Sequence, residues 1–548
     1  MAQLRQRVRA RFERPRVRPA PAFPGLRWQP GGELAAPGAQ RNTSEALQRG
    51  DFVFLNRRES LGFPPASWEQ PHLPRLWEYN LHYFEVLFAL PFAEGARLAR
   101  DWIERHPLER GRVGWEPYPV SLRLQNWSAY FFGRHREATL SDAELCGALW
   151  RSLYAQAEWL ARHLEQHLLG NHLFENAAAL ALCGACFEGP SAQTWRRTGL
   201  VLLAREIEEQ LLPDGGHFER SPLYQARIAW LLQALCWSGD RELLACSAAA
   251  RTRCEKALAQ LAHPDGEIAL LNDSAFGIAT PPGRLLAQAA ASGAFALRET
   301  GYYGAREAAG HYVVCDAAPI APDYLPGHAH GDMLAFELSL AGERVFVDAG
   351  VYDYEPGELR SFCRSTAAHN TVEIEGVDQC EFWAVFRVAR RGRPHDVVWQ
   401  ARDDGFRLEA WQDGYQRLPG RPRHDRAFRW YASGVLMVRD RIRAERPVQA
   451  RSRLHLHPDC EILEQDAHGV LVRFTGGSCR VVFAGEGDLT IETSRHCPEF
   501  GIVRESRALC FAARGANIEN GFCIANAAAS LRYALAAGAH VDGTALPF

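Results

Sequence analysis

Two spacings of apolar residues divide the chain. From Leu76 to residue 297, apolar side chains recur every three or four positions in long stretches such as WEYNLHYFEVLFAL (77–90) and LYQARIAWLLQALCW (223–237). This is the spacing of amphipathic helices. Loops rich in Gly, Pro and Asp separate the stretches, and because short connections favour antiparallel neighbours, the region is predicted to form paired helices.

The C-terminal half has a different period. From residue 298 to 548, short segments such as LAFELSL (334–340) and FRLEAWQ (406–412) alternate apolar with polar residues and end at Gly, Asp or Asn turns. This period of two predicts an antiparallel β-sandwich. Residues 1–75 are rich in Pro, Gly and Arg and are predicted to be an irregular extension. The predicted domains are therefore the extension, an all-α domain over 76–297 and a β-sandwich over 298–548.

Composition narrows the classes of function. The formal net charge is −3, without the basic excess of nucleic-acid-binding proteins, and the 15 Trp and 15 Tyr suit a protein that binds sugars. The sequence has no apolar run of signal-peptide or membrane-span length. Its 14 Cys lie in apolar segments rather than at disulfide-scaffold spacings. We therefore predict a cytoplasmic protein without a membrane span, or a periplasmic one if another route exports it.

Polar residues at successive strand ends predict a site in residues 325–376. His328 and His330 precede one predicted strand, Asp348 ends the next, and His369 precedes a third. Residues i and i+2 of an extended segment project to the same face, so both first imidazoles can point into one site. Imidazole and carboxylate ligands suit zinc. The alternative is that these are separate polar residues at strand ends.

A second candidate site lies in GNHLFEN (170–176). Asn171 can cap the helix that begins here, which would be a structural role. His172, Glu175 and Asn176 fall at positions i, i+3 and i+4 and so share one helix face. A polar face ahead of the apolar run AAALALC favours a functional role.

A third candidate site lies in GGHFERSPLYQAR (215–227). Ser221 and Pro222 form a good N-cap and first helical residue, which places Tyr224 in the first helical turn. The helix dipole there is predicted to lower the pKa of the phenol, and Arg227 to lower it further. The alternative is a packed tyrosine whose hydroxyl is satisfied.

Together the three segments resemble the heparinase II/III family of polysaccharide lyases. HAHGDMLAFELSLAGERVFVDAG (328–350) and STAAHNTVEIEG (365–376) are similar to the family's C-terminal signature nearly throughout. The resemblance covers most of the chain and implies an incomplete (α/α) toroid followed by an antiparallel β-sandwich. It implies four catalytic residues, namely Asn171, His172, Tyr224 and His328. It also implies a structural zinc ion bound by His330, Asp348 and His369.

Further residues are candidates for binding substrate. Glu175 matches an acidic residue of some family members, and the motif WEPYPVSLRLQNW (115–127) is similar to a segment in members that lie near polysaccharide-assembly genes. The motif can equally serve to pack helices. The candidate substrate-binding residues are Glu175, Arg227, Trp115, Tyr118, Arg123, Asn126 and Tyr354.

The implied activity is that of a carbon–oxygen lyase acting on an acidic polysaccharide by β-elimination at a uronic acid. Asn171, His172 and His328 would neutralise the uronate carboxylate, which makes the C5 proton removable. Tyr224 would take that proton, or donate one to the oxygen leaving C4, or do both, with His172 as the alternative base.

Three other functions fit the same residues. A uronic-acid C5 epimerase would abstract the same proton and return it to the other face. A zinc hydrolase would use the metal to activate water, which requires an open coordination position. A non-catalytic glycan-binding protein would leave the polymer intact. The sequence does not name the polymer.

Overall fold

The structure is a computed structural model that describes residues 16–28, 30, 41–109, 111–288 and 290–548. Contacts within the chain divide it into two compact units. Unit 1 comprises Met1–Leu211, Arg227–Cys254 and Gly277–Thr280, and unit 2 comprises Leu212–Ala226, Glu255–Phe276 and Pro281–Phe548. Three stretches of the region predicted as helical, residues 212–226, 255–276 and 281–297, therefore belong to the unit that contains the C-terminal half.

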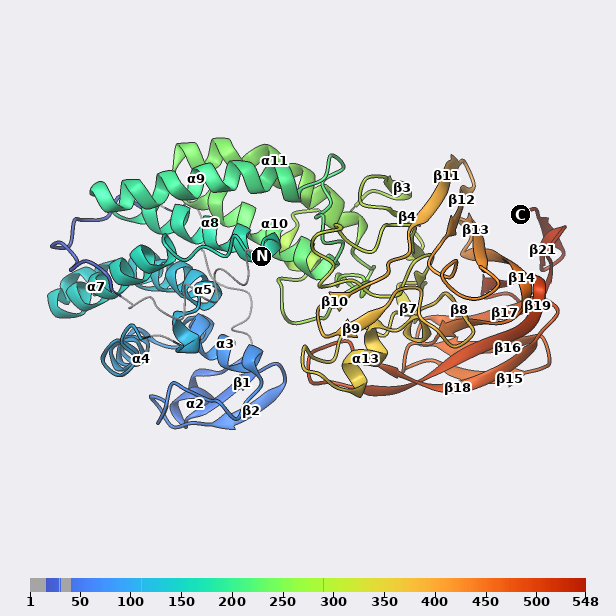
Figure 1. The fold of residues 1–548 in the computed structure, drawn as a ribbon, viewed down its shortest axis with the longest axis horizontal. Coiled ribbons are helices and arrows are strands. Elements are labelled where there is room, and N and C mark those ends of the chain that lie inside the picture. The colour runs from blue at the N-terminus through green and yellow to red at the C-terminus, as the bar shows by residue number, and fades with distance from the viewer. Residues whose placement is uncertain (1–15, 29, 31–40, 110, 289) are drawn as a thin grey trace. The chain divides into compact units, whose positions relative to one another are not determined.

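Helices dominate the chain up to Gln260 (Figure 1). The α-helices are α2 (Ser44–Gln48), α3 (Arg75–Tyr83), α4 (Phe92–Arg105), α5 (Pro117–Trp127), α6 (Arg136–Ser141), α7 (Ala143–Leu160), α8 (Gly170–Cys186), α9 (Pro190–Gln210), α10 (Pro222–Trp237), α11 (Arg241–Gln260), α12 (Pro282–Leu285) and α13 (Glu358–Arg364). Short 3-10 or π turns are η2 (Glu85–Ala89), η3 (Val113–Trp115), η4 (Ser128–Arg134) and η5 (Thr366–Ala368). Within the described residues, no helix has both the length and the apolar character needed to cross a membrane.

Helices α8 and α9 pack against each other closely in unit 1 (Figure 1). A Cβ atom added to Gly184 of α8 would lie 2.4 Å from the backbone nitrogen of Arg196, and one added to Gly199 of α9 would lie 2.5 Å from that of Ala181. The glycines therefore let the two backbones touch. Every residue of α8 except His172 is buried, so this imidazole is where the helix meets solvent.

The segment predicted to be irregular contains short regular elements. Thr43 caps α2 by accepting a hydrogen bond from the backbone of Ala46 at 3.2 Å. Strands β1 (Asp51–Phe54) and β2 (Arg57–Ser60) then form an antiparallel hairpin. Its two turn residues have positive φ, as tight hairpins require. Four-residue strands are too short to produce a clear alternating pattern, which is why the sequence did not predict them.

Strands dominate the chain from Gly293 onward, all in unit 2. They are β3 (Gly293–Leu297), β4 (Tyr302–Arg306), β5 (Tyr312–Asp316), β6 (Phe336–Leu340), β7 (Glu343–Phe346), β8 (Val372–Ile374), β9 (Phe382–Ala384), β10 (Arg387–Val388), β11 (Pro394–Arg402), β12 (Gly405–Gln412), β13 (Arg423–Tyr431), β14 (Val435–His455), β15 (Glu461–Gln465), β16 (Gly469–Phe474), β17 (Gly477–Gly485), β18 (Asp488–His496), β19 (Arg504–Asn526), β20 (Leu531–Ala534), β21 (Gly538–Val541) and β22 (Thr544–Leu546).

Two antiparallel sheets share one core in unit 2. The larger has the order β11-β12-β13-β14-β19-β17-β16-β15, with β18 and β8 paired to β19 and β14, and the smaller has the order β3-β4-β5-β6-β7. Phe336 and Leu338 of the smaller sheet belong to the same apolar cluster as Phe428 and Phe522 of the larger one. The predicted fold class, a helical region followed by antiparallel β-structure, is confirmed.

The smaller sheet is covered on its second face as well. Every residue of β5 and β6 is buried. Tyr312 and Val314 of β5 pack with Ala257, Leu261 and Leu271, from the end of α11 and the loop that follows it. That loop belongs to unit 2 and brings residues 272–274 to the segment that precedes β6.

Candidate active site

Two phenols and an imidazole meet in unit 2. Tyr224 lies in the first turn of α10, Tyr354 lies between β7 and α13, and His328 lies in a turn before β6. The phenolic oxygens of Tyr224 and Tyr354 are 3.1 Å apart, and the ring centroids of Tyr224 and His328 are 4.3 Å apart. All three side chains are only partly buried. A ligand can therefore reach them.

The start of α10 forms as the sequence predicts. Pro222 is the first residue of the helix, and the Ser221 hydroxyl accepts a hydrogen bond from the backbone of Tyr224 at 3.4 Å. The same hydroxyl donates to the backbone carbonyl of Asp273 at 2.7 Å. The helix end that carries the candidate tyrosine is therefore tied to the loop after α11.

The predicted effect of the helix dipole on Tyr224 is wrong in direction. Burial raises the pKa of Tyr224 well above its usual value of 10.0, and neighbouring Tyr354, Asp273 and Glu219 raise it further. The dipole places only about half an elementary charge at the helix end, which is too little to offset burial among acidic groups. Tyr224 is therefore a protonated phenol at neutral pH.

His328 lies between two buried carboxylates. Its Nδ1 donates a hydrogen bond to Oδ2 of Asp273 at 2.8 Å, and its Nε2 lies 3.4 Å from Oε2 of Glu219. The carboxylate side chains of Asp273 and Glu219 are 0% and 2% exposed. Both nitrogens of the ring therefore face acidic groups, which favours an imidazole that donates hydrogen bonds.

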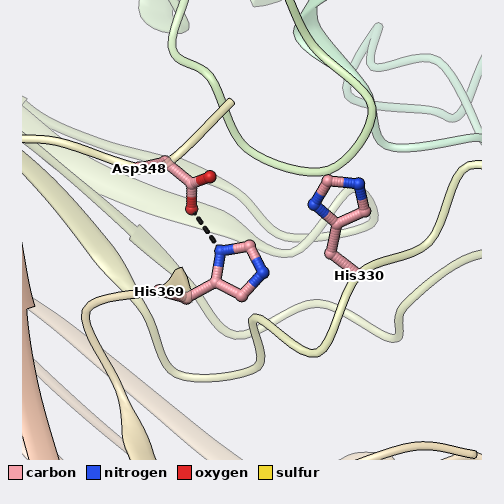
Figure 2. A group of neighbouring side chains, drawn as sticks. All are labelled: His330, Asp348 and His369. Atoms are coloured by element: carbon pink, nitrogen blue, oxygen red, sulfur yellow. Dashed lines mark hydrogen bonds and ion pairs between the residues drawn. The ribbon is translucent and has the colours of Figure 1, made fainter. Parts of the chain in front are cut away.

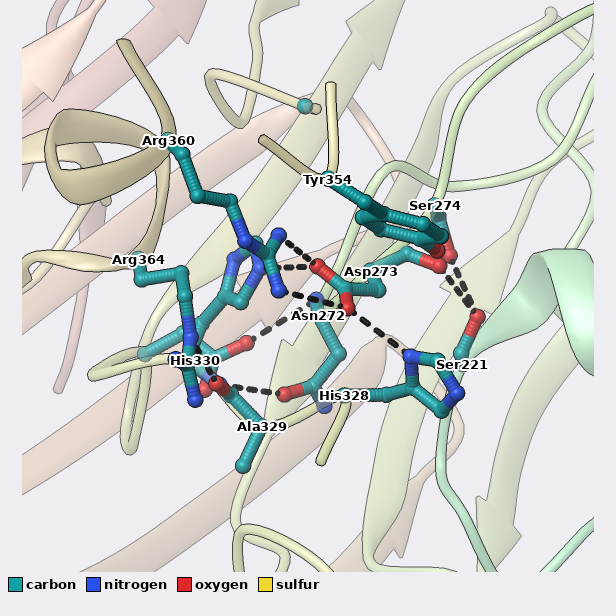
Figure 3. A network of polar contacts seen from close by, with 12 residues as sticks. Ser221, Asn272, Asp273, Ser274, His328, Ala329, His330, Tyr354, Arg360 and Arg364 are labelled. Carbon is teal, nitrogen blue, oxygen red and sulfur yellow. Dashed lines mark hydrogen bonds and ion pairs between the residues drawn. The ribbon is translucent and has the colours of Figure 1, made fainter. Parts of the chain in front are cut away.

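Asp273 is the centre of this network, as Figure 3 shows. Besides the bond from His328, its Oδ1 accepts a hydrogen bond from Nε2 of His330 at 2.8 Å. Both terminal nitrogens of Arg360 donate to the same carboxylate, Nη2 at 2.9 Å from Oδ2 and Nη1 to Oδ1. Burial by itself would raise the pKa of Asp273, but the Arg360 guanidinium and the two imidazoles hold it well below its usual value. Asp273 is therefore an ionised carboxylate inside the protein.

Arg360 connects the carboxylate to one of the two phenols, that of Tyr354. It comes from α13, and its guanidinium lies 5.0 Å from the ring centroid of Tyr354 and 5.6 Å from that of Phe386. Phe386 in turn lies 5.2 Å from Tyr354 and 6.0 Å from His328, measured between ring centroids. Aromatic rings thus form one side of the cluster, which suits contact with a sugar face.

His330, Asp348 and His369 converge a short distance away (Figure 2). One ligand atom from each of them lies within 4.8 Å of the others, and all three residues are buried. Nδ1 of His369 donates to Oδ2 of Asp348 at 2.6 Å. His328 is not a member of this group. The four residues at successive strand ends therefore do not form one site. His330, Asp348 and His369 form one group, and His328 belongs to the neighbouring cluster with Tyr224 and Tyr354.

Within the part of the chain that the structure describes, two nitrogens in this group have no hydrogen-bond partner. They are Nδ1 of His330 and Nε2 of His369, both inaccessible to solvent. Leaving a polar atom buried without a partner costs about 1–3 kcal/mol. Because the other nitrogen of each ring donates to a carboxylate, the unpartnered nitrogen carries the lone pair that a metal ion needs. The donor set therefore fits a zinc ion.

The predicted residues of GNHLFEN lie in unit 1. Helix α8 begins at Gly170, with Leu169 at the N-cap position and no capping side chain, so Asn171 is a residue of the first turn rather than the cap. His172 is one-third exposed, and its Nδ1 lies 3.0 Å from Oε1 of Glu165. The Tyr118 ring lies 4.5 Å from the His172 ring. The place of Asn171 in the first helical turn and the exposure of His172 are both compatible with a functional role.

Glu175 and Arg227 bind each other. Nε and Nη2 of Arg227 donate to the two carboxylate oxygens of Glu175 at 3.0 and 2.9 Å, and Nε2 of Gln125 donates to Oε1 of Glu175 at 2.6 Å. Both side chains are at least nine-tenths buried. The structure therefore favours a supporting role for this pair over direct contact with substrate.

Most of the motif WEPYPVSLRLQNW packs inside unit 1. Arg123 is completely buried and donates to the backbone carbonyls of His82 and Gly114 at 3.1 and 2.7 Å. Asn126 donates to the carbonyl of Tyr83 at 2.8 Å, and Trp115 is 6% exposed. These three positions favour the packing interpretation over sugar binding. Tyr118, beside His172, is partly accessible, as are Glu116 and Pro117 of the same motif.

Sequence reasoning missed three members of the cluster, namely Glu219, Asp273 and Arg360. Glu219 lies within the segment chosen for Tyr224, but nothing local distinguishes it from a surface acid. Asp273 lies in LLNDSAFG, where a polar trio interrupts an apolar run, and all three residues of that trio are buried. A buried polar run of this kind is the signal that could have identified it.

Comparison with known proteins agrees with this architecture. Residues 95–275 match the family description "Heparinase II/III N-terminus", and residues 289–533 match "Heparinase II/III-like, C-terminal". The chain therefore belongs to the heparinase II/III family.

Individual relatives are more distant. A heparin-sulfate lyase of Pedobacter heparinus is 26% identical over 323 residues, which cover 50% of this chain and 47% of the relative. A heparin-sulfate lyase of Bacteroides stercoris is 29% identical over 147 residues, which cover 23% and 21%. The chain thus spans about half the length of the first of these relatives and about a fifth of the second.

Solved structures share the fold over nearly the whole chain. A heparan sulfate lyase mutant from Pedobacter heparinus has a TM-score of 0.65 at 18% identity, covering 99% of this chain and 93% of that one. A structure described as heparinase III has a TM-score of 0.70 at 16% identity, covering 88% and 84%. The predicted architecture, a helical toroid followed by a β-sandwich, is thus the fold that these neighbours share with the chain.

Proposed function

We propose that this chain is a polysaccharide lyase that cleaves a uronic-acid-containing glycosaminoglycan by β-elimination. The observation that carries the proposal is the cluster of Tyr224, Tyr354 and His328, in which the phenolic oxygens are 3.1 Å apart and the imidazole is fixed by a buried carboxylate. The names of the curated relatives, both heparin-sulfate lyases, support this class of substrate.

β-Elimination needs a group that stabilises negative charge on the uronate carboxylate. Proton loss from C5 places that charge on the carboxylate as an enolate-like species, and preorganised hydrogen-bond donors lower its energy. His328 supplies such a donor in unit 2. From the family resemblance, we propose that Asn171 and His172 also neutralise the uronate carboxylate.

The reaction also needs a proton for the oxygen that leaves C4. The raised pKa of Tyr224 suits it to this step, because a weakly acidic phenol gives its proton only to a strong base, and a departing alkoxide is one. Tyr354 can then share its hydroxyl proton with Tyr224 across their hydrogen bond. Removal of the C5 proton by Tyr224 would require its phenolate, which burial opposes, so His172 is the better candidate for the base.

Products separate this proposal from its alternatives. The full chain would be incubated in deuterium oxide with heparan sulfate, hyaluronan, chondroitin and alginate, and the absorbance of the unsaturated uronate would be followed. A lyase gives rising absorbance and shorter chains. New reducing ends without that absorbance would indicate a hydrolase, and deuterium at C5 of an uncut polymer would indicate an epimerase. Either result, or an intact and unlabelled polymer throughout, would contradict the proposal.

We further propose that His330, Asp348 and His369 hold a structural zinc ion. The unpartnered buried nitrogens of the two imidazoles and the convergence of the three side chains support this assignment. When bound, the ion would brace the segment that carries His330 and, two residues earlier, His328. Metal analysis of the purified protein tests it, and a protein that folds and remains free of zinc when supplied with it would contradict it.

A further inference from the structure

We propose that Asp273 and Arg360 form a positioning pair that orients two imidazoles at once, the catalytic one of His328 and the metal-binding one of His330. The inference rests on the proposed function for the role of His328. It assigns a role to two residues outside the predicted catalytic and metal-binding sets.

The first argument is the number of hydrogen bonds that one carboxylate accepts. Asp273 receives two from Arg360, one from His328 and one from His330. A carboxylate has about four lone-pair sites, so its accepting capacity is filled. The side chains of Asp273 and His330 are 0% exposed and that of Arg360 is 2% exposed, so water does not compete for the bonds among these three residues.

The second argument is what these bonds do to the imidazoles. The bond to Asp273 keeps a proton on Nδ1 of His328, which directs Nε2 of that ring away from the carboxylate. The bond from Nε2 of His330 keeps a proton there and leaves Nδ1, the unpartnered atom, with its lone pair. Ala329 alone separates the two histidines, yet their rings reach opposite oxygens of one carboxylate (Figure 3). Loss of Asp273 would therefore release both rings.

The third argument is that the backbone is held independently. The backbone nitrogen of Asp273 donates to the carbonyl of His328 at 3.1 Å. The backbone nitrogen of His330 donates to the side-chain oxygen of Asn272 at 2.9 Å. These bonds do not use the Asp273 carboxylate. A substitution that alters only the carboxylate should thus misplace the rings while the segment keeps its path.

The test is Asp273→Asn in the full, zinc-loaded chain. An amide has one accepting oxygen and an NH2 group, so it cannot accept from both imidazoles and the guanidinium together. We expect kcat to fall about 10–100-fold while KM changes less than about threefold, because orientation rather than binding is lost. We also expect zinc affinity, measured by competition with a chelator, to fall about 10–100-fold. Nitrogen-15 spectra of labelled histidine should show a proton fixed on Nδ1 of His328 in the wild-type chain and no longer fixed there in Asp273→Asn, with His328→Ala assigning the signal.

The matched control is Asp440→Asn. Asp440 is also a fully buried carboxylate in unit 2 bound by an arginine fork and an imidazole, from Arg426 and His424, and it lies outside the candidate site. The Asp440→Asn variant should be less stable than the wild-type chain and should keep its kcat. Equal losses of kcat in both variants would show a general folding effect and overturn the proposal, as would normal kcat and zinc affinity in Asp273→Asn.

A second variant keeps the inference testable if Asp273→Asn does not fold. Arg360→Lys retains the charge beside Asp273 but not the two-pronged contact, so kcat and zinc affinity should fall by a smaller factor. Unchanged values in that variant would overturn the proposal. If the wild-type chain cleaves no uronate polymer, the proposed function fails, and the zinc and nitrogen-15 measurements still decide whether Asp273 orients the two rings.

Discussion

Tyr224 and Tyr354 present their hydroxyl groups to each other at 3.1 Å although 130 positions separate them in the chain. One belongs to the first turn of a helix and the other to the loop before α13, and both have a pKa raised by burial well above 10.0. Because both phenols are neutral and in contact, Tyr224 can donate a proton and Tyr354 can supply another to it.

Replacing either tyrosine by phenylalanine tests this pair. Tyr224→Phe should lower kcat by about 10²–10⁴-fold, the usual range for loss of a general acid or base. Tyr354→Phe should lower it about tenfold, since one hydrogen bond is removed. Tyr312→Phe, which removes a hydroxyl bonded to a backbone carbonyl elsewhere in unit 2, is the control and should turn over normally. Near-normal turnover by Tyr224→Phe would remove it from the mechanism.

His328→Ala should separate catalysis from metal binding. Because its ring lies outside the group of three metal-binding candidates, kcat should fall about 10²–10³-fold while bound zinc and the melting temperature stay close to wild type. His395→Ala provides the control for removing a partly exposed imidazole from unit 2. Turnover at the wild-type rate in His328→Ala would exclude this imidazole from carboxylate stabilisation.

Asp348→Asn should release the metal. The variant loses a negative ligand, so bound zinc measured by atomic emission should fall, and the melting temperature with it, by about 2–10 °C. The exposed carboxylate of Asp459 provides the control, since Asp459→Asn should leave both quantities unchanged. An unchanged zinc content in Asp348→Asn would exclude it as a ligand.

Glu85 should make stability depend on pH. Burial raises the pKa of Glu85 from 4.5 to about 7, against the opposing effect of Arg227. Between pH 4.5 and 7 the folded protein therefore holds a proton that the unfolded chain has released, so the free energy of unfolding should fall as pH rises through this window.

Denaturant titrations at several pH values check this prediction. Glu85→Gln should flatten the dependence, because the amide does not titrate, whereas Glu104→Gln, at an exposed position of α4, should reproduce the wild-type curve. A wild-type slope that persists in Glu85→Gln would assign the effect to another group.

Gly184→Ala should destabilise unit 1 although alanine is the better helix former. The new Cβ would lie 2.4 Å from the backbone of Arg196, and a backbone clash of that size costs about 1–3 kcal/mol, more than the roughly 1 kcal/mol that helix propensity returns. Gly147→Ala in α7 meets only the flexible end of Arg151, so it should be neutral or slightly stabilising. Chemical denaturation of both variants measures the difference, and equal stabilities would refute the close packing of α8 on α9.

Features that depend on local sequence were predictable. The spacing of apolar residues predicted a helical region followed by a strand region, because the side chains of one element face core and solvent with a regular period. The Ser221–Pro222 start of α10 was predictable because capping involves atoms a few residues apart. The family signature indicated His330, Asp348 and His369, which the structure brings together.

Tertiary packing decided which side chains the candidate residues contact. Sequence alone could not show that Arg227 would be bound to Glu175, or that Arg123 would be buried against His82, because these contacts join positions 52 and 41 residues apart. It gave Tyr224 the wrong direction of pKa shift, since the dipole is local and burial is not. Above all it did not identify Asp273, whose importance arises only when the loop after α11 lies beside His328, His330 and Arg360. The sequence by itself therefore determined the elements and their candidate chemistry, and the tertiary structure decided which charges are buried together.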